Sequence, residues 1–334
     1  MRKISSLLSM ILIFTLFFTG ATNKEIKNKS FNVNARNAIA IDRNSKRILY
    51  DKGSHNIVPM ASTTKIVTAL VAIKYGNLDE ELEIGPNAVS IRGSKVGYKK
   101  GEKIKLRELL YGLMYKSGND AAIAIAEGIS GSIDEYVKVM NEYAKEIGLI
   151  DTSFESPHGL DSNKHYSSAY DLAMATIKAK EEPFFNEITS TKSVDGKDKG
   201  FTRSYGNINK ILWQIPEANG VKTGYTGGAG KCLVSSINNG NSDIIIVVLN
   251  CPERWKETEK IYNYTKEIYE YKTPLIDENL PEDIKNKKLP FIKDSVINYD
   301  INIKQEKIKA KELIGSVKVF ENEKEVFIFH VYGE

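Results

Sequence analysis

Ser62 and Lys65 stand three residues apart, at the only place in the chain where a serine precedes a lysine by that spacing. The segment that follows, 66–73, carries apolar residues at helical spacing. Positions three apart on a helix share a face, so the hydroxyl and the amine are expected to meet at the first helical turn. A neutral lysine can take the serine proton and so create a nucleophile. The helix N-terminus would add N–H groups where an oxyanion could form.

Two further short motifs give this pair its weight. Ser117-Gly118-Asn119 ends an apolar segment, and Lys222-Thr223-Gly224 precedes a strand-like stretch. Each motif alone is common. Their order along the chain, at a helix start, in a loop and on a strand with nearby glycines, is what makes the combination informative. The three motifs occur together in class A β-lactamases and penicillin-binding proteins, which form acyl-enzymes on serine.

The chain resembles the serine-type D-Ala-D-Ala carboxypeptidases, which are low-molecular-mass penicillin-binding proteins of the peptidase S11 type. The resemblance is strong over roughly 36–272. It is carried by Pro59-Met60-Ala61-Ser62-Thr63-Thr64-Lys65, Tyr115-Lys116-Ser117-Gly118-Asn119-Asp120-Ala121-Ala122, Pro157-His158-Gly159-Leu160-Asp161 with the segment 165–173, and Val221-Lys222-Thr223-Gly224-Tyr225-Thr226.

The resemblance implies an α/β (α+β) fold. A β-lactamase/transpeptidase-like domain would hold an antiparallel sheet with an inserted helical cluster, and a small β-rich domain would follow it. It also implies a hydrolase that removes the terminal D-Ala from peptidoglycan stem peptides through an acyl-enzyme, that is acylated by β-lactams, and that contributes to cell-wall biogenesis and cell shape. No metal or organic cofactor is implied.

Four catalytic roles follow from the resemblance. Ser62 would attack the carbonyl of the penultimate D-Ala, and Lys65 would take its proton. Ser117 would relay a proton towards the leaving nitrogen, while Asn119 would bind the substrate amide and hold Lys65. A free lysine has a pKa of about 10.4, so Lys65 needs burial or a neighbouring cation to act as a base at neutral pH.

The third motif is expected to bind the substrate. Lys222 and Thr223 would hold the terminal carboxylate, and Lys222 is also the candidate cation beside Lys65. Gly224 would let the substrate backbone approach the strand. The backbone N–H groups of Ser62 and Tyr225 would form the oxyanion hole.

Two other functions stay open. A β-lactamase-like hydrolase could use the same scaffold, although the sequence lacks the E-x-x-L-N segment that would carry a deacylating glutamate. A sensor that is acylated without turnover is the third possible function.

His158 and His165 could suggest a Ser-His-Asp triad with Asp161 or Asp171. Their Pro- and Gly-punctuated loop instead favours histidines that hold the loop together, with Asp161 as an acceptor.

Secondary-structure signals place these motifs on a framework. Alternating segments 37–42 and 47–50 predict a hairpin. Helices are expected after Ser62, at 106–115, at 121–127, and at two serine-capped starts, Ser132 and Ser168. Strands are expected at 220–225, 233–237 and 243–250, with a closing helix over about 257–269. Strands at both ends with helices between them predict one sheet. Strands are also expected at 296–301, 315–320 and 325–331.

The ends of the chain indicate export. Residues 1–21 read as a signal peptide and 22–35 as a flexible leader, followed by a peptidase domain over 36–272 and a β-rich domain over 273–334. The expected location is the extracytoplasmic face of the envelope or outside the cell. Net charge is only +4, and no basic block interleaved with aromatics indicates nucleic acid. The family's C-terminal amphipathic helix has no counterpart here, so membrane attachment is not predicted either way.

The sequence also leads to expectations about the two cysteines and the two tryptophans. Cys232 and Cys251 fall on neighbouring strands and could form a disulfide or stay two buried thiols. Trp213 and Trp255 are expected to pack in the core.

Overall fold

A computed structural model describes residues 31–273, 282–303 and 313–332 of the chain. The expected signal peptide and nearly all of the expected leader lie outside these residues. The compact unit begins at Val33.

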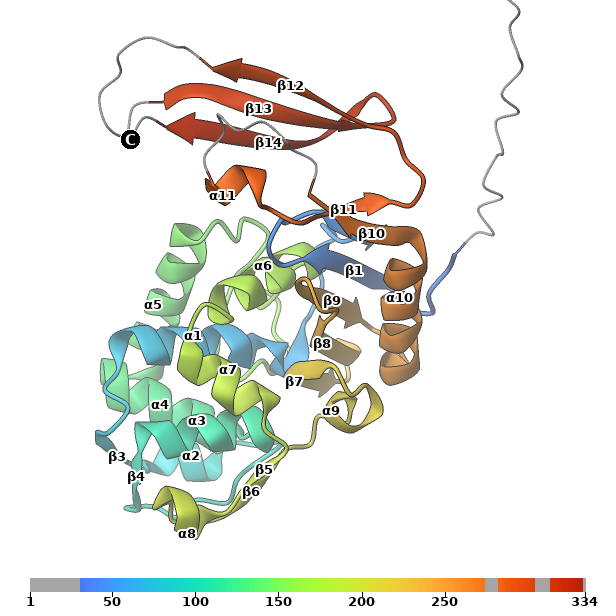
Figure 1. The fold of residues 1–334 in the computed structure, drawn as a ribbon. Coiled ribbons are helices and arrows are strands. Elements are labelled where there is room, and N and C mark those ends of the chain that lie inside the picture. Colours follow the sequence, from blue (N-terminus) through green and yellow to red (C-terminus); the bar gives the residue numbers. More distant parts are fainter. Residues whose placement is uncertain (1–30, 274–281, 304–312, 333–334) are drawn as a thin grey trace, which may run out of the picture. The chain divides into compact units, whose positions relative to one another are not determined.

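The core is a five-stranded antiparallel sheet of order β2-β1-β9-β8-β7 (Figure 1). Its strands are β1 (Asn37–Asp42), β2 (Ile48–Lys52), β7 (Ala218–Thr226), β8 (Gly230–Asn238) and β9 (Asp243–Leu249). The prediction that strands from both ends of the domain share one sheet is confirmed. All seven residues of β9 are buried, because α6 (Ala169–Ala179) and α10 (Arg254–Ile268) both pack on this strand. The third sequence motif, Lys222-Thr223-Gly224, lies on β7, which the strand order places at an edge of the sheet.

A helical cluster is inserted between β2 and β7 (Figure 1). Its longer helices are α1 (Lys65–Tyr75), α3 (Leu106–Tyr115), α4 (Asn119–Ser130), α5 (Ile133–Glu146), α6 and α7 (Pro183–Ser190). Shorter elements are a 3₁₀ turn η1 (Ala61–Thr64), α2 (Pro86–Ser90), α8 (Gly196–Lys199), α9 (Ile211–Gln214), and the strand pairs β3 (Glu81–Glu83) with β4 (Lys103–Lys105) and β5 (Ser193–Val194) with β6 (Tyr205–Gly206).

The two serine-capped helices begin where the sequence predicts. Ser132 Oγ accepts a hydrogen bond from the Glu135 N–H at the start of α5, and Ser168 Oγ accepts one from the Asp171 N–H at the start of α6. Such caps satisfy N–H groups that have no partner within the helix. The buried residues of α5 recur at helical spacing and are Tyr136, Met140, Tyr143 and Ala144.

The C-terminal part is rich in strands, as expected. β10 (Tyr269–Lys272) pairs with β11 (Leu289–Ile292), and β12 (Ile297–Ile303), β13 (Leu313–Glu321) and β14 (Lys324–Tyr332) form a three-stranded sheet. Arg47, just before β2, connects this part to the five-stranded sheet. Its guanidinium forms an ion pair of 2.5 Å with Glu321 and donates to the Pro290 carbonyl at 2.6 Å. Both charged side chains are largely removed from water, with 11% and 5% exposed.

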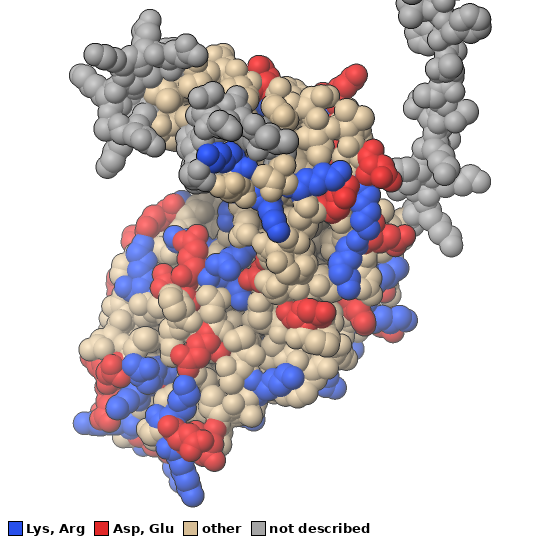
Figure 2. Space-filling view, viewed as in Figure 1, with Lys and Arg blue, Asp and Glu red and all other residues tan. Residues whose placement is uncertain are grey.

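On the face shown in Figure 2, positively and negatively charged side chains are interspersed.

Cys232 and Cys251 are both free thiols and both buried, so the two-thiol alternative holds in this structure. The expectation that both tryptophans are core residues is wrong for Trp213, whose side chain is 53% exposed. Lys192 lies over its ring at 5.8 Å from the centroid, which lets an apolar ring stay at the surface.

Candidate active site

The proposed nucleophile lies on a tight turn that leads into a buried helix. Ser62 belongs to η1, and α1 begins only at Lys65, so the pair spans a 3₁₀ turn and not the first α-helical turn that the sequence predicted. In a 3₁₀ turn, side chains at i and i+3 eclipse, which brings the pair even more directly into line. Lys65 Nζ lies 2.9 Å from Ser62 Oγ. Ala61, with φ of +52°, makes the sharp entry into the turn.

The amine of Lys65 has three oxygen neighbours and no access to water. Besides Ser62 Oγ, it contacts Asn119 Oδ1 at 2.8 Å and the His158 carbonyl at 2.7 Å. Its side chain is 0% exposed. Asn119 opens α4 and His158 lies in the loop before α6, so three separate segments converge on one nitrogen.

Burial and a second lysine shift the pKa of Lys65. Removal from water lowers it well below the usual lysine value, and the nearby charge of Lys222 lowers it further. Lys222 is itself buried, and desolvation followed by the charge of Arg254 lowers its pKa to about 7. The neutral form of Lys65 is therefore favoured at neutral pH, which is what a general base requires.

The second and third motifs meet across the site. Lys222 Nζ, on β7, donates to Ser117 Oγ at 2.9 Å and to the Thr223 carbonyl at 2.9 Å. Ser117 has a φ of +57°, a conformation that non-glycine residues rarely adopt. The N-cap position of α4 belongs to Gly118, the residue after Ser117. The Ser117 hydroxyl instead accepts from Lys222 Nζ, a position from which it could relay a proton.

The edge strand β7 passes directly beside the nucleophile turn. A Cβ at Gly224 would lie 3.1 Å from the Ser62 nitrogen and 3.2 Å from the Met60 carbonyl oxygen. The glycine was expected to admit the substrate backbone, and here it admits the nucleophile turn. Thr223 is almost buried, and Tyr225 projects outward with 68% of its side chain exposed. The two N–H groups expected to form an oxyanion hole, those of Ser62 and Tyr225, thus belong to adjoining segments.

The two histidines hold the loop that supplies the third oxygen to Lys65. His165 Nδ1 accepts from the Glu155 N–H at 3.0 Å, and its Nε2 lies 2.8 Å from Thr64 Oγ1. His158 Nδ1 accepts from the Leu160 N–H at 3.2 Å. Desolvation foremost lowers the pKa of His158 to about 3 and that of His165 to about 4, so both are neutral at pH 7. These contacts fit a structural role better than a triad.

The family model for D-alanyl-D-alanine carboxypeptidases, peptidase S11, matches residues 22–253. The chain belongs to this family. It is 37% identical over 284 residues to the D-alanyl-D-alanine carboxypeptidase DacF of Bacillus subtilis, covering 80% of this chain and 72% of that protein. It is 33% identical to DacC of Escherichia coli, covering 73% of this chain and 64% of the relative.

Solved structures of the family share the fold. Penicillin-binding protein 6B from Escherichia coli superposes with a TM-score of 0.76 at 26% identity, over 92% of this chain and 98% of that one. DacD from Francisella tularensis gives a TM-score of 0.75 at 25% identity, over 95% and 98%. The expected β-lactamase/transpeptidase-like fold, with its antiparallel sheet and inserted helices, is therefore confirmed, as is membership of the D-Ala-D-Ala carboxypeptidases.

Arg254 is a site residue of this S11 domain that sequence reasoning missed. It opens α10, and its guanidinium donates to the Gly224 carbonyl at 2.7 Å and to the Cys232 carbonyl at 3.1 Å. It thereby bonds to the third motif and adds positive charge beside Lys222. No short motif marks it, because its partners are backbone carbonyls of distant residues. Asp161 was expected to accept hydrogen bonds within its own loop. It accepts them instead from Thr226 Oγ1 at 2.6 Å and from the Gly228 N–H at 2.9 Å.

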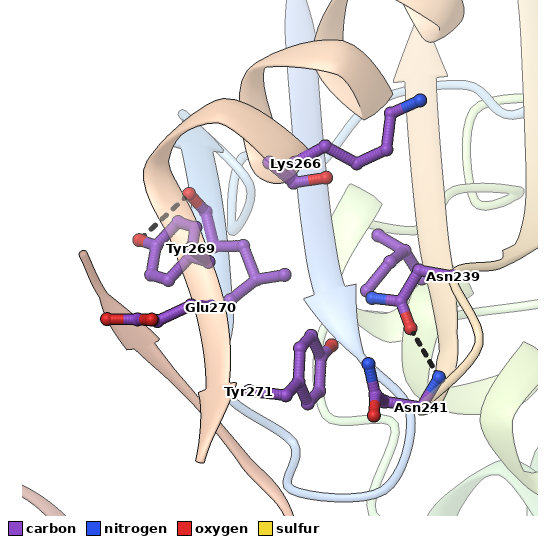
Figure 3. Close-up of a pocket in the computed structure, with 9 residues that line it drawn as sticks. Asn239, Asn241, Lys266, Tyr269, Glu270 and Tyr271 are labelled. Atoms are coloured by element: carbon purple, nitrogen blue, oxygen red, sulfur yellow. Dashed lines mark hydrogen bonds between the residues drawn. The ribbon is translucent and has the colours of Figure 1, made fainter.

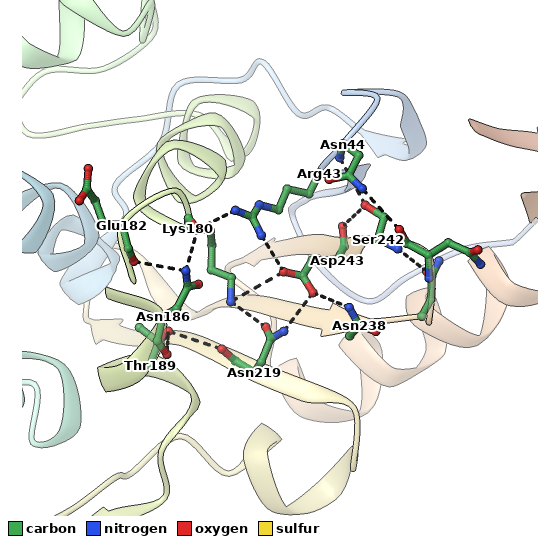
Figure 4. A network of polar contacts seen from close by, with 12 residues as sticks. Arg43, Asn44, Lys180, Glu182, Asn186, Thr189, Asn219, Asn238, Ser242 and Asp243 are labelled. Atoms are coloured by element: carbon green, nitrogen blue, oxygen red, sulfur yellow. Dashed lines mark hydrogen bonds and ion pairs between the residues drawn. The ribbon is translucent and has the colours of Figure 1, made fainter. Parts of the chain in front are cut away.

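A buried polar network supports the start of the β7 strand (Figure 4). Lys180 Nζ, after α6, donates to Asn219 Oδ1 at 3.0 Å and lies 3.8 Å from Asp243 on β9. Asn219 Nδ2 donates to Asp243 Oδ1 at 3.0 Å, and Arg43 forms an ion pair with Asp243 at 3.3 Å. Asn219 stands three residues before Lys222 on the same strand. The network therefore anchors the strand that carries the third motif.

Other features of the described residues lie apart from this constellation. A hollow of about 170 Å³ lies between the β8–β9 turn and the α10–β10 junction, and its lining includes Asn239, Lys266 and Tyr271 (Figure 3). It contains none of the expected site residues. Within the described ranges, no group of three metal-binding side chains occurs, and no helix has the length and apolarity needed to span a membrane.

Proposed function

We propose that this chain removes the C-terminal D-Ala from peptidoglycan stem peptides through an acyl-enzyme on Ser62, and that β-lactams acylate the same oxygen. The arrangement around Lys65 supports this most directly. A neutral amine has two hydrogens and one lone pair. Asn119 Oδ1 and the His158 carbonyl can only accept, so they take both hydrogens and leave the lone pair facing Ser62 Oγ.

The acylation step uses this lone pair. Ser62 Oγ forms a bond to the carbonyl carbon of the penultimate D-Ala while its proton passes to Lys65 Nζ. The carbonyl oxygen becomes negative, and the N–H groups of Ser62 and Tyr225 stabilise it. The C–N bond then breaks, and a proton delivered through Ser117 leaves with the amine of the terminal D-Ala. Water hydrolyses the ester, returns the proton to Ser62 and releases the shortened peptide.

Lys222 and Thr223 bind the terminal carboxylate in this proposal. With a pKa lowered to about 7, Lys222 is partly protonated in the free protein at neutral pH. A carboxylate beside it favours the charged form. Substrate binding would thus complete the charge on Lys222, and that charge in turn keeps Lys65 neutral.

The wider setting belongs to the same proposal. The substrate lies in the cell wall, so residues 1–21 would act as an export signal and the protein would work outside the cytoplasm. The domain division at 36–272 and 273–334 is likewise proposed. The proposed break falls just after β10, which follows α10 and pairs with β11 on the other side of the break.

One experiment separates the three functions. The purified protein is incubated with diacetyl-Lys-D-Ala-D-Ala and, separately, with a penicillin, and both reactions are followed by mass spectrometry. Steady D-Ala release with a long-lived penicilloyl adduct is expected. Rapid penicillin turnover would identify a β-lactamase instead, and adducts without any turnover would identify a sensor.

A pair of serine variants locates the chemistry. Ser62→Ala should abolish both the adduct and D-Ala release, whereas Ser90→Ala, which changes an exposed serine on α2, should leave both unchanged. Activity surviving in Ser62→Ala would overturn the site assignment.

A further inference from the structure

Asp161 connects two segments of the chain that lie on either side of the nucleophile turn. It belongs to the loop between α5 and α6, and its carboxylate accepts hydrogen bonds from Thr226 Oγ1 at 2.6 Å and from the Gly228 N–H at 2.9 Å. Thr226 is the last residue of β7, and Gly228 lies in the turn that leads from β7 to β8. One carboxylate therefore joins this loop to the end of the strand that carries the third motif.

The nucleophile turn η1 contacts the backbone of both segments. On the loop side, a Cβ at Gly159 would overlap the Ala61 carbonyl oxygen. On the strand side, a Cβ at Gly224 would lie 3.1 Å from the Ala61 Cβ and 3.1 Å from the Ser62 nitrogen. Loop, turn and strand are thus packed in series, and the hydrogen bonds of Asp161 close the series into a ring of contacts that contains Ser62.

The same ring holds two other groups of the proposed reaction. Three residues before Asp161, the His158 carbonyl accepts from Lys65 Nζ at 2.7 Å. One residue before Thr226, Tyr225 supplies the second N–H group of the proposed oxyanion hole. The Tyr225 side chain is 68% exposed, so the position of its N–H group depends on the backbone on either side.

The turn that follows Thr226 needs support because it is rich in glycine. Three of its four residues, 227–230, are glycines, which have the most conformational freedom to lose and bring no side chains to hold the turn. Asp161 fixes the Gly228 N–H directly. It also fixes the Thr226 hydroxyl, whose oxygen accepts from the Ala229 N–H at 3.1 Å. Removing the carboxylate would therefore loosen the end of β7.

We propose that Asp161 is a positioning residue of the oxyanion hole. Its carboxylate fixes the end of β7 so that the N–H groups of Ser62 and Tyr225 converge on the same substrate oxygen. Loss of one such donor costs about 100- to 1000-fold in kcat, and a misplacement of about 1 Å can cost about 100-fold. This inference rests on the proposed acyl-enzyme chemistry and adds to it a residue that acts through the strand.

A boronic acid isolates the contribution of the oxyanion hole. In the diacetyl-Lys peptide of (1-aminoethyl)boronic acid, boron replaces the carbonyl carbon of the penultimate D-Ala. Ser62 Oγ forms a bond to boron, its proton passes to Lys65, and no bond to boron breaks. The adduct therefore stays tetrahedral and negatively charged, with a boron-bound hydroxyl in place of the oxyanion.

Four variants are compared with the wild type. Asp161→Ala removes the carboxylate, Asp161→Asn keeps one acceptor oxygen, and Thr226→Val removes the hydroxyl on the strand side. Asn163→Ala changes an exposed residue of the same loop and serves as the control. The measurements are the inhibition constant of the boronic acid and kcat/KM for diacetyl-Lys-D-Ala-D-Ala over a range of pH. Rates are expressed per folded site, counted from the final amount of penicilloyl adduct.

Asp161→Ala should lower kcat/KM by about 10- to 100-fold at every pH and weaken the boronic acid by a similar factor. Asp161→Asn and Thr226→Val should each show a smaller loss, because one of the two hydrogen bonds remains. Asn163→Ala should stay within about twofold of the wild type in both measurements.

Any of three results would overturn the assignment of Asp161. They are unchanged kinetics in Asp161→Ala, a lower kcat/KM without weaker binding of the boronic acid, and a loss confined to the acid limb. The last result would show that Asp161 acts only through its charge on the ionisation of the site.

A failure of the proposed function is distinguishable from these results. If the wild type releases no D-Ala, the carboxypeptidase function fails. Asp161 is then judged by the boronic acid and by the rate of penicillin acylation. Both should still be impaired in Asp161→Ala, and wild-type values for both would overturn its assignment.

Discussion

Lys65 and Lys222 are both buried, with 0% and 1% of their side chains exposed, and burial followed by the charge of Lys222 lowers the pKa of Lys65. Two lysines placed so close together away from water favour one neutral amine and one ammonium. The nucleophile motif and the strand motif, whose lysines stand 157 positions apart in the chain, are thereby coupled electrostatically as well as by the packing of Gly224 against the nucleophile turn.

This coupling predicts the effect of removing the Lys222 charge. In Lys222→Gln the pKa of Lys65 should rise, because one cause of its depression is gone. Lys65 works only when neutral, so the acid limb of the penicillin acylation rate should move to higher pH. The measurement is the acylation rate as a function of pH, and an unmoved acid limb would contradict the coupling.

Lys222→Gln also removes the charged partner proposed for the substrate carboxylate. It should therefore lower kcat/KM for the peptide by about 10- to 100-fold.

Asn119→Asp provides a second test of the same base. Aspartate keeps an acceptor for Lys65 but places a negative charge beside it, which favours the ammonium and should raise the pKa of Lys65. It also loses the donor to the Arg92 carbonyl, so two acceptors would face each other where a 2.7 Å hydrogen bond now stands. Acylation at pH 7 should fall by about 10- to 100-fold and recover partly at higher pH. A loss that is equal at every pH would show that the asparagine acts only through position.

Much of the framework could be predicted from local patterns. The strands at both ends alternate or are wholly apolar, and Ser132 and Ser168 cap helices where the sequence placed them. These patterns depend on a few neighbouring residues, so they can be recognised in the sequence without knowledge of the fold. The three motifs were found in the same way.

The remainder of the site depends on contacts that no local pattern encodes. The His158 carbonyl and the guanidinium of Arg254 reach the site through the packing of segments far apart in sequence, and their partners are backbone or lysine atoms. The exposure of Trp213 was mispredicted for a similar reason. Hydrophobicity alone placed it inside, whereas α9 presents it at the surface beside Lys192.

The Arg47–Glu321 pair should matter for stability. Both groups are largely buried, and Glu321 Oε1 also accepts from the Ile292 N–H at 2.7 Å, while Arg47 lies over the rings of Tyr269 and Phe327. Glu321→Gln leaves a buried guanidinium without its counter-charge, so we expect a loss of about 2–4 kcal/mol in the free energy of unfolding.

The control for that variant is an exposed ion pair in the same sheet. Lys318 and Glu325 lie 3.0 Å apart with 41% and 42% of their side chains exposed. Glu325→Gln should therefore change the free energy of unfolding by less than about 1 kcal/mol. Urea unfolding of the full chain measures both, and equal effects of the two variants would refute the difference in burial as the cause.

His165 makes stability depend on pH. Thr64 Oγ1 donates to the Ala61 carbonyl at 2.8 Å, so it accepts from His165 Nε2–H, while Nδ1 accepts from Glu155. A proton on Nδ1 would break that last bond, in keeping with the burial that lowers the pKa to about 4 from an unfolded value of 6.5.

Between these values the unfolded chain binds the proton and the folded chain does not. The stability that His165 contributes is therefore complete above pH 6.5 and is lost as pH falls towards 4, by up to about 3 kcal/mol. His165→Gln should flatten the decline in unfolding free energy measured in urea between pH 7 and 4.5, although His158 adds a decline of its own. His330→Gln, at an exposed histidine on β14, should leave the decline as in the wild type. A decline of the same steepness in His165→Gln would mean that this ring is protonated in the folded protein and that the Nε2–H tautomer is wrong.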